Sequence, residues 1–315
     1  RYDVHLAQDL LEYNLIMNVS YRYQARILGN NNPELVNTAP IALWRLMVWL
    51  GSAIPVTTLL LKLGLKPPTA FIEDEKFVSE AGHQTYIAAI TNDDVIWWTA
   101  YLQATDEATL TAAFESFKVE VRRCFPRYVP RLALTDGHLP AQAALRNTFD
   151  SVAIQECILH IQRKVNTDLA TYRRKNPEVP EAFLESAGTR IWDALSTSKN
   201  VSEFSQRLRR VRESFNGDPL MTGRVNKVMA KRDRLTEHLR RRAVPTTSVE
   251  LDQKFKWLNR KYHQMQSLMS ETGGRALANA WAIARNFWRF MKGAKRAGKS
   301  PVEIAGLDLS GHPWL

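Results

Sequence analysis

The chain has 315 residues, 45% of them hydrophobic and 24% charged, and its 43 Lys and Arg against 32 Asp and Glu give a formal net charge of +11. This composition is that of a globular protein and excludes wholesale disorder, collagen and a coiled coil. The positive excess favours a polyanionic partner.

The cysteine count and the hydropathy indicate where in the cell the protein is expected. The two cysteines, Cys124 and Cys157, are too few for a disulfide scaffold or a thiolate zinc site, which favours a cytoplasmic protein. The lipid-like stretch at 39–61 is interrupted by an Arg, a Gly and a Pro, so we expect no membrane span. The chain begins without an initiator methionine or a signal pattern, so we expect a preceding N-terminal piece.

The first 66 residues are predicted to be helical. Leu10, Leu11 and Leu15 recur at helical spacing, and a second helix is expected over 40–50. Two helices across a polar turn are compatible with a helix-turn-helix, and plain helical packing gives the same pattern. Both interpretations stay open for this region.

From residue 67 the hydrophobic pattern becomes that of strands separated by Gly and Asn-Asp turns. The next segment is acidic at its start and basic at its end, as a helix dipole prefers. The predicted elements are strands at 70–77, 84–91 and 95–104, a helix at 106–124, a strand at 131–137, a helix at 139–149 and a strand at 151–158. This order predicts a mixed α/β sheet.

After residue 160 the strand pattern disappears until about residue 243. Residues 205–242 hold twelve basic residues against four acidic ones, which fits a solvated helix face or a phosphate-binding surface. The side chains that we expect to bind nucleic-acid phosphates are Arg207, Arg209, Arg210, Lys231, Arg232, Arg240, Arg241 and Arg242.

Two aspartates could carry chemistry. Asp74 lies within an otherwise apolar strand, and Asp136 lies where the fourth strand gives way to a Gly turn, the usual place for ligands in an open α/β sheet. Alone, Asp74 fits an exposed edge strand and Asp136 fits an ordinary turn. Together they would lie near one end of neighbouring strands, where bound divalent cations offset their repulsion.

Other motifs are weaker. Residues 293–300 match the P-loop expression, but they follow a predicted helix rather than a strand, so we expect no nucleotide cofactor. Cys157 and His160 form a lone C-x-x-H at the end of the fifth predicted strand, where two ligands are too few for a zinc site and a packing or supporting role is expected. His138 fits a phosphate contact or a turn.

These residues resemble a known family. TDGHLPAQAALRNTF followed by VAIQECILHIQRKV resembles the aspartate-glycine, helix, strand, Cys-x-x-His core of bacterial insertion-sequence transposases of the mutator-like, acidic-triad (DDE/D) type. IEDEK resembles their first-aspartate strand, TTSVELDQKFKWLNRK the helix bearing their third acid, and GKSPVEIAGLDLSGHPWL their closing tail. The similar stretches lie between residues 71 and 315, with the basic helical part unmatched.

The resemblance implies an RNase H-like α/β fold, in which a mixed five-stranded sheet is interrupted by a helical insertion before the helix of the third acid. The parts expected are a helical N-terminal region at 1–66, the first part of the catalytic core at 67–166, a basic all-helical insertion at 167–245, and the third-acid helix with a C-terminal tail at 246–315.

Carried over by position, Asp74 and Asp136 are the first two acids. The family helix reads T-S-N-x-x-E, and alignment on residues 247–249 puts the third acid at Asp252, with Val in place of Asn. Glu250 is the alternative. Because two residues differ by about 200° around a helix, only one of them can face the metals, and the spacing favours Asp252.

The implied activity is DNA cleavage and strand transfer with two Mg²⁺ ions, or Mn²⁺, about 4 Å apart on three carboxylates. His138, Cys157 and His160 would contact the metal ligands rather than the metals themselves. The implied partners are double-stranded DNA at the element ends and target, and further copies of the chain, at the nucleoid. Two alternatives stay open, namely a catalytically inactive DNA-binding relative and a structure-selective RNase H-like nuclease.

Overall fold

The strands form one mixed five-stranded sheet in the order β3-β2-β1-β4-β5, which confirms the predicted mixed α/β class. Strand β1 pairs antiparallel with β2 and parallel with β4, and the outer pairs continue these directions. The strand bounds are β1 Ala70–Glu80, β2 His83–Asn92, β3 Val95–Leu102, β4 Leu132–Thr135 and β5 Ala153–Glu156. The computed structural model describes residues 9–31, 39–215, 217–241, 244–265, 267–290 and 296–309.

Strand β1 lies in the middle of this sheet, so Asp74 is not on the exposed edge that its charged neighbours also allowed. The antiparallel strands meet at tight turns. Asp93 and Asp94, between β2 and β3, have φ of 49° and 69°. Two left-handed residues in succession suit a two-residue hairpin, and Asp tolerates this conformation better than most residues.

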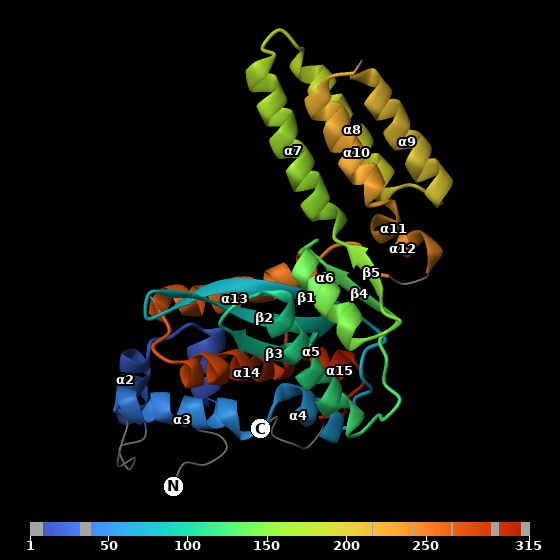
Figure 1. The fold of residues 1–315 in the computed structure, drawn as a ribbon. Coiled ribbons are helices and arrows are strands. Elements are labelled where there is room, and N and C mark those ends of the chain that lie inside the picture. Colours follow the sequence, from blue (N-terminus) through green and yellow to red (C-terminus); the bar gives the residue numbers. More distant parts are fainter. Residues whose placement is uncertain are drawn as a thin grey trace.

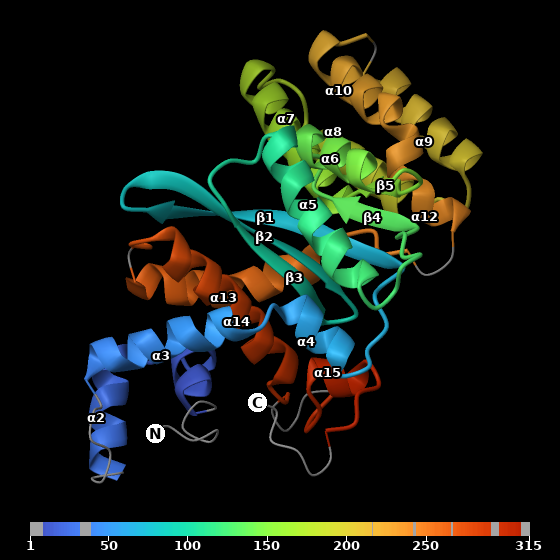
Figure 2. The same cartoon turned by 60° about the horizontal axis from the view of Figure 1, so that its bottom comes forward.

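Helices cover both faces of the sheet (Figure 2). On one face, α5 (Glu107–Arg122) sends Phe117 edge-on against Phe71 of β1, and α6 (Leu139–Thr148) lies beside it. On the other face lie α13 (Val249–Met265) and α14 (Glu271–Phe287), whose Phe255 and Trp281 rings stack 5.6 Å apart. Residues far apart in the sequence therefore close a single core around the sheet.

Between β5 and α13 the described chain contains helices joined by short loops, and these form a second bundle with its own hydrophobic core, which projects from the sheet beyond β5 (Figure 1). We call residues 158–241 the insertion. Its core includes Ile158 and Ile161, which precede the predicted boundary at 167. The helices are α7 Ile158–Lys175, α8 Glu181–Ser196, α9 Val201–Ser214, α10 Pro219–Ala230, α11 Arg232–Leu235 and α12 Glu237–Arg240.

The described part of the N-terminal region is helical, with η1 Glu12–Ile16, α2 Tyr21–Asn31, α3 Pro40–Ala53 and α4 Val56–Lys62. Helix α3 packs closely on α14 at Gly51. A Cβ at this position would lie 2.1 Å from the Ala276 carbonyl oxygen, so only glycine fits there. Within the described residues no single helix is long and apolar enough to cross a membrane, although α3 and α4 together pass that test as a pair bent by 59°.

The P-loop-like segment lies in a helical context. It follows α14 and precedes α15 (Pro301–Ile304), which Ser300 and Glu303 start with a reciprocal capping box. Its first residues, 293–295, lie outside the described ranges. A phosphate-binding loop needs a preceding strand and a following long helix, and among the described residues around this segment there is neither.

Candidate active site

The sheet register brings Asp74 and Asp136 to the same level. The last residue pair between β1 and β4 is Ile72 with Leu134, and each aspartate lies two residues further along its own chain. Because the two strands run parallel, both side chains come to the carboxyl edge of the β1–β4 pair, where α/β sheets bind ligands. The charge of Asp136 reaches Asp74 and raises its pKa.

The turn after β4 is built around the second aspartate. The His138 backbone N–H donates to Asp136 Oδ1 at 2.7 Å, which orients the carboxylate. Gly137 between them has φ of 95°, and a Cβ there would lie 3.0 Å from Glu156 Oε2. Glycine suits position 137 for two reasons. It adopts this positive φ freely, and a larger residue would crowd the Glu156 carboxylate.

Helix α13 brings Asp252 to the same group. At its start the Asp252 backbone N–H donates to the Ser248 carbonyl at 3.0 Å, and the charge of Asp252 also raises the pKa of Asp74. Arg163 of α7 is the cation beside it, with Nη2 3.9 Å from Asp252 Oδ2. Carboxylates from the β4 turn and from α13 therefore both act on Asp74 of β1.

The pKa of Asp74 reflects its burial and the negative charges around it. Burial raises its pKa most, the charges of Asp136, Glu75 and Asp252 raise it further, and a 2.8 Å hydrogen bond from the Glu75 backbone N–H lowers it in part. The net result is a pKa of about 7. Such a group of acids gains from a bound cation, because positive charge offsets both the burial cost and the repulsion.

Glu250 contacts the β2–β3 turn. Its Oε1 accepts hydrogen bonds from Thr91 Oγ1 at 3.0 Å and from the Asp94 backbone N–H at 2.9 Å, and it is ion-paired with Lys254. Burial lowers the Lys254 pKa to about 8 despite this partner. Glu250 thus holds α13 to the β2–β3 turn, whereas Asp252 lies near Arg163 and its charge reaches Asp74.

Cys157 and His160 lie beside the acids, although Cys157 caps the start of α7 rather than ending β5. Ser248 joins them, since its Oγ is 3.5 Å from both Cys157 Sγ and His160 Nδ1. Burial raises the thiol pKa, but hydrogen bonds from His160 and Ser248 bring it down to about 7. The bond to Cys157 and the charges of Asp74 and Asp136 raise the His160 pKa against the effect of burial.

Two further carboxylates of β1 escaped the sequence analysis. Glu75 Oε1 lies 3.2 Å from His138 Nδ1, and this contact raises the histidine pKa. Glu73 is 1% exposed, and neither of its oxygens has a hydrogen-bond partner among the described residues. Burial raises its pKa well above the ordinary value, followed by the charges of Glu75, Asp74 and Asp136. The alternation of a strand predicts that both lie on the face opposite Asp74.

The donor chemistry of Asp74, Asp136 and Asp252 suits a hard divalent cation, because Mg²⁺ prefers carboxylate oxygen. Their placement is looser than a closed metal centre. Within the described ranges no three His, Cys, Asp or Glu side chains stand close enough together to hold a metal ion. The fit thus rests on the oxygen donors and on the burial and nearby negative charges that together raise the Asp74 pKa.

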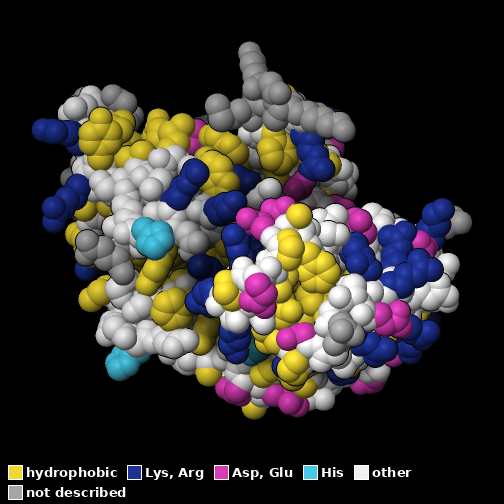
Figure 3. All heavy atoms as spheres, turned by 90° about the horizontal axis from the view of Figure 1, so that it is seen from above, with side chains coloured by type: hydrophobic (Ala, Val, Ile, Leu, Met, Phe, Trp, Pro, Cys, Tyr) yellow, Lys and Arg dark blue, Asp and Glu magenta, His cyan; other side chains and the backbone are white. Residues whose placement is uncertain are grey.

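The predicted DNA-binding residues fall into two groups. Ion pairs hold Arg207 to Glu203, Lys231 to Glu156, Arg232 to Asp233, and both Arg240 and Arg241 to Glu237. Arg209 and Arg210 of α9 are exposed and have no ion pair within the described part of the chain. Arg242 lies outside the described residues. Figure 3 shows Lys and Arg gathered toward the right of the view, the side on which α9 lies in Figure 1.

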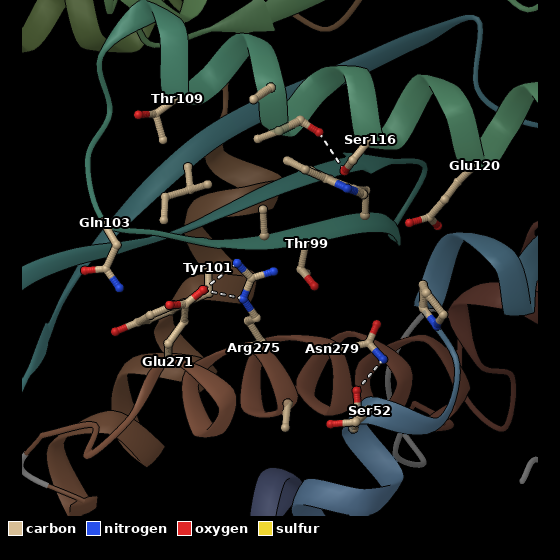
Figure 4. A pocket seen from close by; sticks show the side chains of 18 residues that line it. Ser52, Thr99, Tyr101, Gln103, Thr109, Ser116, Glu120, Glu271, Arg275 and Asn279 are labelled. Atoms are coloured by element: carbon tan, nitrogen blue, oxygen red, sulfur yellow. Dashed lines mark hydrogen bonds and ion pairs between the residues drawn. The ribbon is translucent and has the colours of Figure 1, made fainter.

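A cavity of about 790 Å³ lies away from these acids, between β3, α5 and α14 (Figure 4). Its polar lining includes Tyr101, Glu271 and Arg275, and none of the predicted site residues lines it. In comparison with known proteins, the chain matches no protein-family model and no curated protein sequence. The candidate site therefore rests on its own geometry.

Proposed function

We propose that the chain is a DDE/D-type transposase, an enzyme that cleaves DNA strands and transfers them in a metal-dependent reaction on an RNase H-like core. The observation that carries the proposal is that the charges of both Asp136 and Asp252 act on the carboxyl group of Asp74 and raise its pKa. The strand order, and a helical insertion between β5 and the helix of the third acid, support it further.

In this proposal Asp74, Asp136 and Asp252 hold the metal, and Glu250 has a structural role. These carboxylates would hold magnesium, which would supply the positive charge needed for an in-line displacement at a phosphodiester. His160 lies beside the acids, and the hydrogen bond to Cys157 and the charges of Asp74 and Asp136 raise its pKa. Cys157 and Ser248 hold the His160 ring, and His138 orients Asp136 through its backbone N–H.

DNA binding is assigned mainly to the outer face of the insertion. Arg209 and Arg210 are the exposed guanidinium groups best suited to phosphates, because they have no competing carboxylate among the described residues. Phosphate contacts of this kind make affinity fall as salt rises. A reaction that joins element ends to target DNA also calls for more than one copy of the chain on the DNA, and we include that assembly in the proposal.

The test uses the purified full-length protein, Mg²⁺ or Mn²⁺, and a plasmid carrying the DNA that flanks the coding sequence. Cleavage followed by joining supports a transposase, cleavage alone indicates a nuclease, and binding alone indicates an inactive relative. Asp136→Asn should abolish cleavage and leave DNA binding nearly intact. Asp150→Asn is the matched control, because this exposed aspartate lies in the α6–β5 turn. Cleavage that survives Asp136→Asn would disprove the site.

A further inference from the structure

Strand β5 ends in two polar residues that are completely buried, Gln155 and Glu156. Both bind the insertion. Gln155 Nε2 donates to the Leu235 carbonyl at 3.3 Å, and its Oε1 accepts from the His238 backbone N–H at 3.1 Å. Since buried polar groups persist only where partners satisfy them, these two side chains fix the returning arm of the insertion to the sheet.

Glu156 carries the stronger contacts. Its Oε2 lies 2.7 Å from Lys231 Nζ and its Oε1 lies 3.1 Å from Arg234 Nε. The carboxylate is 0% exposed, whereas the two cations are 25% and 28% exposed. Burying a carboxylate is costly unless cations and hydrogen bonds replace the lost water, and Lys231 and Arg234 supply these contacts to Glu156.

This ion-pair cluster touches both neighbours of Asp136. On one side, a Cβ at Gly137 would lie 3.0 Å from Glu156 Oε2 and 3.6 Å from Lys231 Nζ. On the other side, Gln142 Nε2 bridges Thr135 Oγ1 at 3.2 Å and Glu156 Oε1 at 3.3 Å. Because both of its neighbours contact the cluster, the backbone of Asp136 depends on the cluster for its position.

We infer that Glu156 is a positioning residue for Asp136, and that Lys231 and Arg234 couple the insertion to that acid. The inference rests on the proposed function for its catalytic consequence only. It assigns Lys231 to the coupling of two parts of the fold rather than to DNA phosphates. DNA held by the outer face of the insertion would then be linked mechanically to the turn that carries the second acid.

The test compares Glu156→Gln, Lys231→Met and Lys231→Arg in the full-length protein. Lys227→Met is the matched control, because Lys227 is exposed on α10, four residues before Lys231, and the change removes the same charge. Hydrogen exchange of the segment 134–140 is measured by mass spectrometry, since amides exchange faster where local structure opens more readily. The kcat and KM for plasmid cleavage are measured in parallel.

We expect Glu156→Gln and Lys231→Met to speed exchange at 134–140 and to lower kcat about tenfold or more, as loss of a group behind a metal ligand does, with little change in KM. Lys231→Arg should restore both readouts, and Lys227→Met should alter neither. Lys231→Met retains Arg234 beside Glu156, so it keeps the test valid if Glu156→Gln does not fold.

Two results would overturn the inference. One is unchanged exchange at 134–140 in a folded Lys231→Met protein. The other is a raised KM with unchanged kcat in that variant, which would return Lys231 to the DNA-binding surface. Should the wild-type protein not cleave DNA, the proposed function fails by itself, and the exchange measurement still decides whether the insertion is coupled to the Asp136 turn.

Discussion

Ser248 lies against Cys157, with its backbone N–H and its Oγ at 3.3 Å and 3.5 Å from the Cys157 sulfur. The contact joins the residue that starts α7 to the residue just before α13, on either side of the insertion. Beside it the Ile158 N–H donates to the Thr246 carbonyl at 3.0 Å. The insertion therefore leaves and re-enters the core at one point, which brings Asp252 to Asp74.

The first prediction concerns this contact. His160→Ala should raise the Cys157 pKa above about 7, because burial already raises it and His160 is a main opposing influence. The measurement is the ultraviolet absorbance of the thiolate against pH, in a Cys124→Ser background that removes the exposed cysteine. His83→Ala, at the exposed start of β2, should leave the titration unchanged. A Cys157 titration that does not move in His160→Ala would contradict the pairing.

The second prediction concerns stability against pH. The Asp74 pKa is raised from 3.8 to about 7, so between these values the folded chain binds more protons than the unfolded one. Stability contributed by this group is therefore complete below about pH 4 and is lost as pH rises toward 7. The full loss is up to about 4 kcal/mol, from about 1.4 kcal/mol per pKa unit.

Asp74→Asn removes this dependence. Without divalent cations, urea unfolding should show the variant gaining on the wild type between pH 4 and pH 8, and Mg²⁺ at pH 8 should stabilise the wild type more than the variant. The same difference between the two proteins at both pH values would show that Asp74 titrates normally.

The third prediction separates the two candidate third acids. Asp252→Asn should abolish cleavage with little effect on stability, because its side chain is 29% exposed and its nearest cation is 3.9 Å away. Glu250→Gln should keep cleavage but lower the free energy of unfolding by about 3 kcal/mol, since it leaves the buried Lys254 without its partner. Cleavage assays and urea unfolding of both variants decide, and the reverse pattern would make Glu250 the metal ligand.

The fourth prediction concerns DNA binding. Replacing Arg209 and Arg210 with Gln should weaken binding to all sequences alike and reduce the slope of log affinity against log salt by about 2, or about one per lost phosphate contact. Arg207→Gln is the control on the same helix, because its guanidinium already contacts Glu203 and Thr197. Fluorescence anisotropy with duplex DNA at several salt concentrations measures both. An equal effect of the control would show that exposure does not select the DNA contacts.

Local patterns in the sequence predicted much of the fold. Short runs of β-branched and aromatic residues between turn residues predicted all five strands, because such side chains fit a sheet that is covered on both faces. The proximity of Asp74 and Asp136 followed from their places near the ends of parallel neighbours. The opposite directions of Glu250 and Asp252 followed from helix geometry, since two residues span about 200°.

Pairings between distant residues lay beyond these patterns. Glu156 and Lys231 are 75 residues apart, and nothing near either residue signals an ion pair. Counting basic residues gave the charge of the insertion but not which side chains carboxylates had already bound. Glu73 stood within a run of charges that is typical of an exposed strand, and only the central position of β1 explains its burial.

The most direct test of the account is an anomalous-scattering map of crystals grown with Mn²⁺ and a DNA oligonucleotide. We expect metal peaks in contact with carboxylate oxygens of Asp74, Asp136 and Asp252, and no metal at Glu250. Crystals of a protein that cleaves DNA, with metal bound at other side chains and none at Asp74 or Asp136, would contradict it.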